Sequence, residues 1–221
     1  ATNATLCSVR HSIDTRDEFY EKENEYFDEV GPLFSNLAVE ANKTILSSKH
    51  LEDLKKHFGP HYFEILECSL VMKEEAIPFM QKENALVSKY NKLIASAKID
   101  FDGKTNTLAQ MGPYTQVADR KTRKEAHEAI TKFFEENEAE FDKIYDDLVK
   151  VRNEMALALG YKNYVDLQYK FLYRTDYNSE DVKRYREYIY KNFTPLAVKL
   201  REKQAESCLL YTSDAADDSL R

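Results

Sequence analysis

The chain has 221 residues, 43% of them hydrophobic and 12% aromatic, and its 39 acidic residues outnumber 32 basic ones. The aromatic content argues against an intrinsically disordered chain. Five glycines and five prolines are too few for the turns of an all-β protein, so the composition favours helices. A formal charge of -7 disfavours nucleic acid as a partner, because phosphate binding needs clustered Lys and Arg.

The same composition bears on the cellular compartment. No apolar run approaches the roughly 18–20 residues that span a bilayer, and no signal-peptide pattern is present. Three widely scattered cysteines do not form a disulfide framework. These features predict a cytoplasmic protein without a membrane partner.

The first half of the chain shows apolar residues at helical spacing. Thr15 and Glu18 have the spacing of a capping box, which predicts the start of a long helix. Gly31-Pro32 should kink or split that helix, because proline lacks the amide proton of the helical ladder and crowds the preceding turn. Further helices are predicted over residues 48–58, 61–72 and 75–96.

One segment changes its period and predicts a small β-hairpin near 96–108. Residues 97–101 alternate between apolar and polar side chains, as a half-buried strand does. Asp102-Gly103 follows, and this dipeptide suits a type I′ hairpin turn.

The second half of the chain returns to helical spacing. Asp119 is the expected N-cap of the longest helix, from Arg120 to about Leu159, and Gly160 is the expected C-cap. A shorter helix near 163–172 and a final one over 179–206, which Pro195 should bend, complete the chain. The predicted fold is therefore mainly α: a multi-helix lobe with long amphipathic helices and one hairpin.

The pair His127-Glu128 begins like the zinc-peptidase motif H-E-x-x-H. That motif works because two histidines at i and i+4 project from one helical face, with the Glu placed as general base. Here the i+4 position is Thr131, so a surface His-Glu pair is the favoured interpretation.

The remaining histidines and thiols have simple interpretations. His50, His57 and His61 are interrupted by a Gly-Pro pair, which favours surface or helix-end positions. Cys7 and Cys68 each lack a C-x-x-C partner, so buried, unreactive thiols are expected.

Two polar clusters carry open alternatives. Glutamates gather near two adjacent aromatic residues: Glu128, Glu135, Glu136, Glu138 and Glu140. A pair of these carboxylates could act as acid and base if their environments differ, although a solvated helix face is the favoured interpretation. A second cluster could line a peptide groove, although core packing with a structural ion pair is favoured: Tyr169, Tyr173, Arg174 and Tyr177. The residue chemistry alone shows no complete catalytic constellation.

Many segments, in order from about Leu6 to Glu206, match one family pattern. They are Val9–Thr15, Glu18–Tyr20, Tyr26–Glu29, Gln81–Asn84, Lys92–Ile99, Asp119-Arg120, Phe133–Glu138, Ile144–Arg152, Leu159–Tyr164, Arg174–Tyr177, Pro195 and Lys199–Arg201. In these segments the chain resembles the amino-terminal half of M3-family oligoendopeptidases, the oligoendopeptidase F group.

The resemblance implies a helical zinc metalloendopeptidase that hydrolyses oligopeptides. Its zinc would be held by the two histidines of H-E-x-x-H and a downstream Glu, with the motif's Glu activating the metal-bound water. None of these positions occurs in this chain, so no catalytic or metal residue is assigned and the substrate-binding residues are unknown. The chain would form the helical wall of the substrate cleft, would bind no zinc itself, and would need the carboxy-terminal catalytic half as its partner.

The end of the sequence departs from this pattern. Cys208–Asp218, back-translated, resembles the transposase adapter of sequencing libraries. We therefore expect residues 1–207 to be the peptidase portion, incomplete at both ends and interrupted near Ser207, and residues 208–221 to be a non-native tail; a genuine polar tail is the alternative.

A second function is also consistent with the sequence. The alternative to a peptidase fragment is a free-standing helical protein-interaction module without catalysis.

Overall fold

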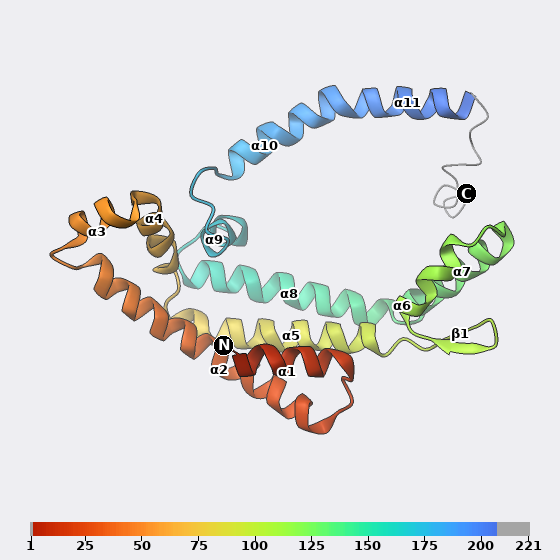
Figure 1. Cartoon of the computed structure of the whole chain (residues 1–221), viewed down its shortest axis with the longest axis horizontal. Helices are drawn as coiled ribbons and strands as arrows, with labels where there is room; N and C mark the ends of the chain where they lie inside the picture. Colours follow the sequence, from red (N-terminus) through yellow and green to blue (C-terminus); the bar gives the residue numbers. More distant parts are fainter. Residues whose placement is uncertain (1, 207–221) are drawn as a thin grey trace. The chain divides into compact units, whose positions relative to one another are not determined.

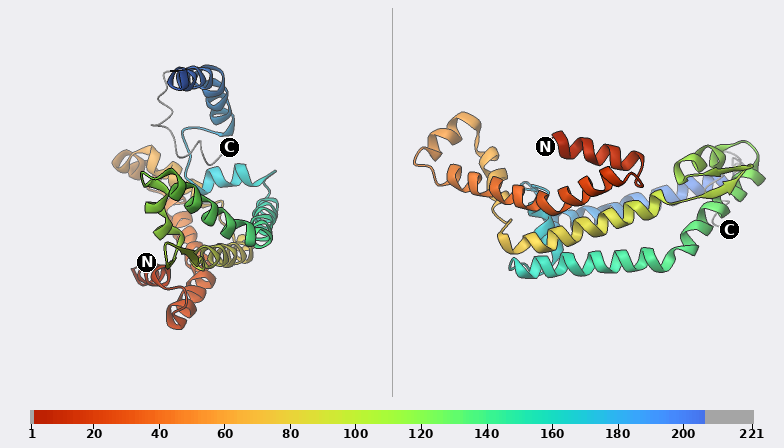
Figure 2. Two further views of the ribbon diagram at one scale, coloured as in Figure 1. Left: turned by 90° about the vertical axis from the view of Figure 1, so that its right-hand side faces the viewer. Right: turned by 90° about the horizontal axis from the view of Figure 1, so that it is seen from below.

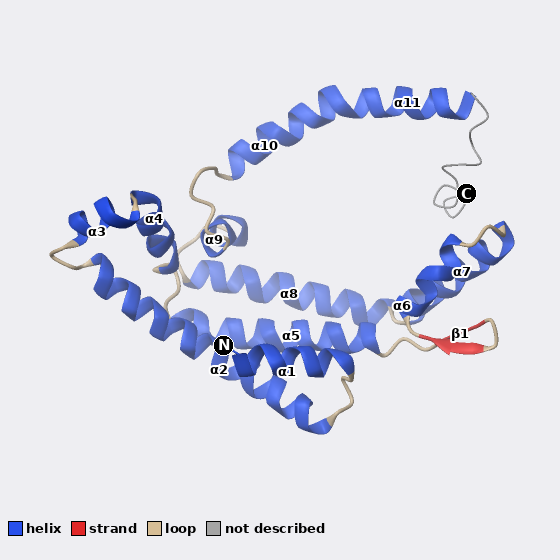
Figure 3. Cartoon of the chain, viewed as in Figure 1, coloured by secondary structure: helices blue, strands red, loops and turns tan. Residues whose placement is uncertain are grey.

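The computed structural model describes residues 2–206, and helices make up most of this range (Figure 1, Figure 3). The α-helices are α1 (Thr2–Ile13), α2 (Glu18–Leu46), α3 (Leu51–Phe58), α4 (Pro60–Ser69), α5 (Ile77–Ala95), α6 (Leu108–Met111), α7 (Arg120–Glu136), α8 (Glu138–Ala158), α9 (Tyr164–Phe171), α10 (Ser179–Tyr188) and α11 (Thr194–Glu206). The strands are β1 (Ile99–Phe101) and β2 (Lys104–Asn106). The predicted mainly α fold with one hairpin is confirmed, whereas the tail predicted for 208–221 lies outside the described residues.

Two compact units make up the chain. Among the described residues, unit 1 contains residues 2–89 and 144–182, and unit 2 contains residues 90–143 and 183–206. No helix within residues 2–206 combines the length and the apolar character needed to cross a membrane.

Helix α2 begins differently from the prediction. The carboxylate of Asp17 is the N-cap and accepts hydrogen bonds from the backbone N–H groups of Phe19 and Tyr20, at 2.9 and 3.2 Å. The capping box expected from Thr15 and Glu18 is therefore wrong. A carboxylate next to the first turn satisfies two orphan amide protons by itself, and this leaves Thr15 outside the helix.

Pro32 lies inside α2, yet the helix is not split there. Proline at this position leaves the Asp28 carbonyl without its usual helical donor. The Asn84 amide of α5 donates to that carbonyl at 3.0 Å, and the Gln81 amide donates to the adjacent Glu29 carbonyl at 2.7 Å. Because Asn84 of the neighbouring helix supplies the donor that Pro32 lacks, the helix continues through the proline.

The side chain of Asp28 extends this α2–α5 contact. Its Oδ2 accepts hydrogen bonds from Ser88 Oγ at 2.6 Å and from Asn24 Nδ2 at 3.1 Å, and Asn24 also donates to Ser88. Polar groups that are mutually satisfied in this way fix the register of the two helices.

The core of unit 1 gathers buried residues from α2, α8 and α9, and from the segments that precede α5 and follow α8. Its buried members are Val39, Met72, Ala76, Met155, Ala156, Leu159 and Leu167. α5 and α8 lie side by side in Figures 1 and 2. Their facing residues Glu83 and Arg152 form an ion pair with a Nε–Oε1 distance of 2.7 Å.

The predicted C-cap of α8 is confirmed. Gly160 has a φ of 83°, its N–H donates to the Leu157 carbonyl, and the Tyr161 N–H donates to the Ala156 carbonyl at 2.8 Å. This is the Schellman arrangement, in which a left-handed glycine lets the last helical carbonyls find donors.

The single helix predicted from Arg120 to Leu159 is two helices, α7 and α8, separated at Asn137. The expected N-cap is correct, because Asp119 accepts the Thr122 N–H at 2.8 Å. At Asn137, with φ -112° and ψ 9°, the side-chain amide donates to the Phe133 carbonyl at 2.8 Å. Asparagine competes in this way with the backbone hydrogen bonds of a helix, and apolar spacing does not register that competition.

The hairpin of unit 2 has the predicted turn. Strands β1 and β2 are antiparallel, with Ile99 opposite Asn106, and Asp102 and Gly103 have φ values of 53° and 68°. Two consecutive positive φ values define the type I′ turn. Ile99 packs with Met111 and Ala126 in a small second core, which anchors the hairpin on α7.

The helix predicted over 179–206 is present but contains a wide turn. The π-helical segment η3 (Ile189–Phe193) joins α10 to α11, and Pro195 is the second residue of α11. Proline cannot donate to the carbonyl four residues back, and a π-helical turn is one way a helix accommodates this.

Candidate functional site

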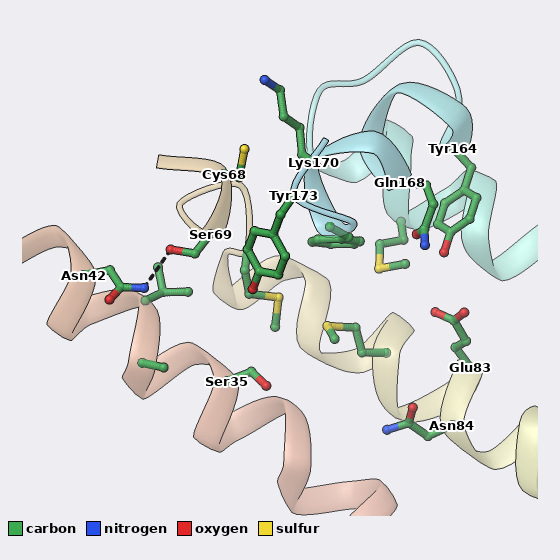
Figure 4. A pocket seen from close by; sticks show the side chains of 16 residues that line it. Ser35, Asn42, Cys68, Ser69, Glu83, Asn84, Tyr164, Gln168, Lys170 and Tyr173 are labelled. Atoms are coloured by element: carbon green, nitrogen blue, oxygen red, sulfur yellow. Dashed lines mark hydrogen bonds between the residues drawn. The ribbon is translucent and has the colours of Figure 1, made fainter. Parts of the chain in front are cut away.

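A cavity of about 460 Å³ lies within unit 1, between α2, α4, α5, α8 and α9 (Figure 4). Its apolar lining includes the buried residues Val39, Met72 and Met155, with exposed fractions of 4%, 5% and 1%. Met80 and Phe171 also line it and are partly buried. The cavity therefore opens from the hydrophobic core of unit 1.

One end of the cavity carries Glu83, Tyr164 and Gln168, which Figure 4 shows on the same side. The Glu83 carboxylate accepts a hydrogen bond from Arg152, whose guanidinium carbon lies 5.5 Å from the centre of the Tyr164 ring. Burial opposes the charge on Arg152, but the hydrogen bond and the negative charge of Glu83 outweigh it and raise the pKa of Arg152. Burial, followed by the nearby Glu83 charge, raises the pKa of Tyr164, so its hydroxyl stays protonated.

The opposite end carries Asn42, Ser69 and Cys68. Asn42 Nδ2 donates to Ser69 Oγ at 2.9 Å, a contact drawn as a dashed line in Figure 4. Cys68 is a buried free thiol, as predicted. The cavity is thus polar at both ends and apolar between them.

The structure places the predicted cluster of Tyr169, Tyr173, Arg174 and Tyr177 in two separate environments. The guanidinium carbon of Arg174 lies 4.6 Å from the centre of the Tyr169 ring and 5.7 Å from that of Tyr177. This is packing of a cation against two rings, worth about 0.5–1 kcal/mol at an exposed site. Tyr173 lines the cavity instead and is 52% exposed.

The predicted thiol and histidine positions agree with the structure. His50, His57 and His61 are exposed, as expected for surface or helix-end residues. Cys7 is buried and free, and burial raises the pKa of its thiol.

His127 and Glu128 lie on α7, where the Glu128 carboxylate pairs with Lys124 at 3.6 Å. Within residues 2–206, no three His, Cys, Asp or Glu side chains are grouped so that they could hold a metal ion. The residues that the structure describes therefore do not fit the zinc site implied by the resemblance.

The cavity itself was not predicted. Its polar end depends on Glu83 and Arg152, which are 69 residues apart in sequence. No local spacing indicates such a pair; the only signal was that both residues fall in segments matching the family pattern.

Comparison with known proteins identifies the family. A model of the peptidase M3 N-terminal domain matches residues 1–72, and a model of peptidase family M3 matches residues 113–210. The chain belongs to the M3 peptidase family and is similar to oligoendopeptidase F. The comparison with curated proteins gave no significant match.

Three solved structures are similar to the chain. One is assigned as an oligoendopeptidase F (44% identity, TM-score 0.87), with 92% of this chain and 36% of that one covered. Another, from Bacillus anthracis strain Ames and assigned likewise, has 43% identity and a TM-score of 0.86, with 90% and 37% covered. PZ peptidase A with an inhibitor has 46% identity and a TM-score of 0.87, with 92% and 36% covered. The chain thus spans little more than a third of the length of these relatives.

Proposed function

We propose that this chain supplies the non-catalytic helical wall of the substrate cleft in a zinc-dependent M3 metalloendopeptidase that hydrolyses oligopeptides. The observation that carries the proposal is the match of 92% of the chain to 36% of PZ peptidase A at 46% identity. The sequence supplies scaffold segments of the family but no H-E-x-x-H. Zinc and peptide-bond chemistry are therefore assigned to the part of the relatives that this chain does not span.

The exposed apolar residues of α10, η3 and α11 support this role. Their exposed fractions lie between 48% and 73%: Tyr185, Tyr188, Tyr190, Phe193, Leu196, Val198 and Leu200. Burial of apolar surface contributes roughly 25 cal/mol per Å², so a helix this rich in exposed apolar groups gains stability when another segment covers it. We take that segment to be the part of an M3 peptidase that this chain does not span, and the coverage of only 36% of PZ peptidase A supports this choice.

The experiment is a split-enzyme assay with a short fluorogenic peptide. The chain is assayed alone with zinc, and then mixed with the complementary part of the Bacillus anthracis relative. We expect no turnover by the chain alone, and hydrolysis by the mixture that a metal chelator abolishes.

The control is the complementary part assayed alone, which tests whether this chain contributes to the activity. The complementary part alone should be less active than the mixture, because it lacks the cleft wall. Zinc-dependent turnover by this chain alone would contradict the proposal, and so would full activity of the complementary part without it.

The exposed apolar residues of α10, η3 and α11 are also consistent with a second function, that of a helical protein-interaction module without catalysis. A module that folds independently should be a monomer with one cooperative thermal transition. A lobe that has lost its partner should instead self-associate through the exposed apolar residues. Sedimentation velocity over a hundredfold concentration range separates the two.

The extent of the native portion is also proposed. Residues 1–207 would be the M3 part, located in the cytoplasm as the free thiols of Cys7 and Cys68 suggest. Residues 208–221 would be foreign to it. Sequencing the source DNA through the codon of Ser207 tests this: a native reading frame that encodes Cys208–Arg221 and then stops would contradict it.

A further inference from the structure

We propose that the cavity of unit 1 binds an uncharged peptide segment by taking up one of its apolar side chains. The choice of a peptide as the ligand class rests on the proposed function, whereas the preference for an apolar, uncharged segment rests on the cavity itself. With a volume of about 460 Å³, the cavity falls within the range of about 300–1,000 Å³ that is typical of small-ligand sites.

The floor of the cavity favours an apolar side chain. Met72, Met80 and Met155 line it; Met72 comes from the segment between α4 and α5, Met80 from the start of α5 and Met155 from the later part of α8. Methionine is unbranched and polarisable, so it adapts to apolar groups of different shape and is common at surfaces that bind varied partners. This composition suits leucine-like or aromatic residues without selecting one of them.

The Gln168 amide supplies the recognition of a peptide backbone. Its side chain is partly buried, faces the same end of the cavity as Tyr164 in Figure 4, and has no hydrogen-bond partner within residues 2–206. An amide side chain offers both donors and an acceptor, which matches the N–H and C=O of a peptide unit. The nearby hydroxyl of Tyr164, protonated because burial raises its pKa, offers a second donor.

The charges around the cavity disfavour an ionic ligand. The Glu83 carboxylate is already paired with Arg152, so neither charge is available to neutralise a ligand. The Lys170 amine points away from the cavity in Figure 4. A carboxylate or ammonium on the bound side chain would lose its hydration without gaining a partner, which is costly.

The methionines can serve as NMR probes of the cavity, because three of the four in the chain line it. Met111 is the fourth; it is fully buried in the second core, within unit 2, and is the internal reference. The full chain, labelled with ¹³C at the methionine methyls, is titrated by NMR with N-acetyl-leucine methylamide and with N-acetyl-aspartate methylamide. We expect saturable shifts of Met72, Met80 and Met155 with the leucine probe only, and none at Met111.

A matched pair of variants tests the backbone contact. Gln168→Leu removes the amide while keeping a side chain of similar size, and should weaken binding of the leucine probe about 3- to 10-fold, as loss of one hydrogen bond does. Gln116→Leu, at an exposed glutamine of unit 2, should leave the affinity unchanged.

Three results would overturn the proposal: no shift of the cavity methionines, an equal shift of Met111, or equal binding of the aspartate probe. An unaffected Gln168→Leu variant would remove the backbone contact from it. None of these measurements needs zinc or turnover. A silent split-enzyme assay with clear methionine shifts would therefore refute the proposed function alone, and the reverse pattern would refute the cavity site alone.

Discussion

Two stretches of this chain have similar helical patterns and opposite surroundings. In residues 144–171, Ile144, Val151, Met155 and Leu167 are at most 1% exposed. In residues 183–206 no residue whose burial is described is buried, and Leu200 is 55% exposed. The first stretch is covered by apolar partners within residues 2–206, and the second is not covered by them.

Apolar spacing therefore identifies a helix without identifying what covers it. Burial of a helix face depends on residues far away in sequence, and the M3 relatives carry nearly two thirds of their length outside the matched region. This contrast supports our proposal that the partner of residues 183–206 lies in the part of the relatives that this chain does not span.

The largest expected effect compares two leucines. Leu167→Ala should lower the free energy of unfolding by about 3 kcal/mol, because it opens a void in a fully buried site. Leu200→Ala should change it by less than about 0.5 kcal/mol, because the side chain is already half exposed. Urea unfolding of both variants measures the difference, and equal losses would contradict the contrast.

An intermediate effect is expected where α5 supports the proline of α2. Asn84→Ala removes the donor to the Asp28 carbonyl and should cost about 1–2 kcal/mol. In a Pro32→Ala background the helix regains its own N–H, so the same change should cost about 1 kcal/mol less. A double-mutant cycle by urea unfolding measures this coupling, and strict additivity would show that Asn84 does not replace the missing donor.

The smallest effect is a pH dependence at the start of α7. Hydrogen bonds from the Thr122 hydroxyl and backbone N–H hold the pKa of Asp119 below its ordinary value. A carboxyl whose pKa is lower in the folded state stabilises the fold at pH values above its pKa in the unfolded chain, which is about 3.9. That stabilisation is lost as the pH falls through the pKa of the folded state.

Asp119→Asn is the matched control, because asparagine caps a helix equally well but does not titrate. Any stability advantage of the wild type over this variant in urea unfolding should be constant from pH 7 to pH 5 and shrink below about pH 4. A difference that does not change with pH would exclude the ionised Asp119 carboxylate as the stabilising form of the cap.

Local chemistry explains which parts of the fold the sequence predicted. The hairpin turn at Asp102-Gly103, the N-cap at Asp119 and the C-cap at Gly160 each depend on one or two residues, and all three are confirmed. Their backbone conformations are set by neighbouring atoms, which a sequence pattern contains.

The features that the sequence did not predict depend on contacts that local spacing does not contain. The prediction that Gly31-Pro32 would kink or split the helix is wrong about the split, because donors come from α5, about 50 residues away. The break at Asn137 was missed because it depends on a side chain that competes with the hydrogen bonds of the helix backbone. The cavity combines residues from five helices and could not be predicted from spacing. The resemblance to M3 peptidases indicated the family, but it gave no residue of the chain a role in this cavity.

The most direct test of the contrast is hydrogen exchange of the chain alone and in mixture with the complementary part of the Bacillus anthracis relative. Amides of α5 within unit 1 should be protected in both samples, because that helix is packed within the chain. Amides of residues 194–206 should exchange rapidly in the chain alone and become protected at least tenfold in the mixture. Strong protection of residues 194–206 in the isolated, monomeric chain, or no gain of protection in the mixture, would show that these residues are not a surface covered by the rest of an M3 peptidase.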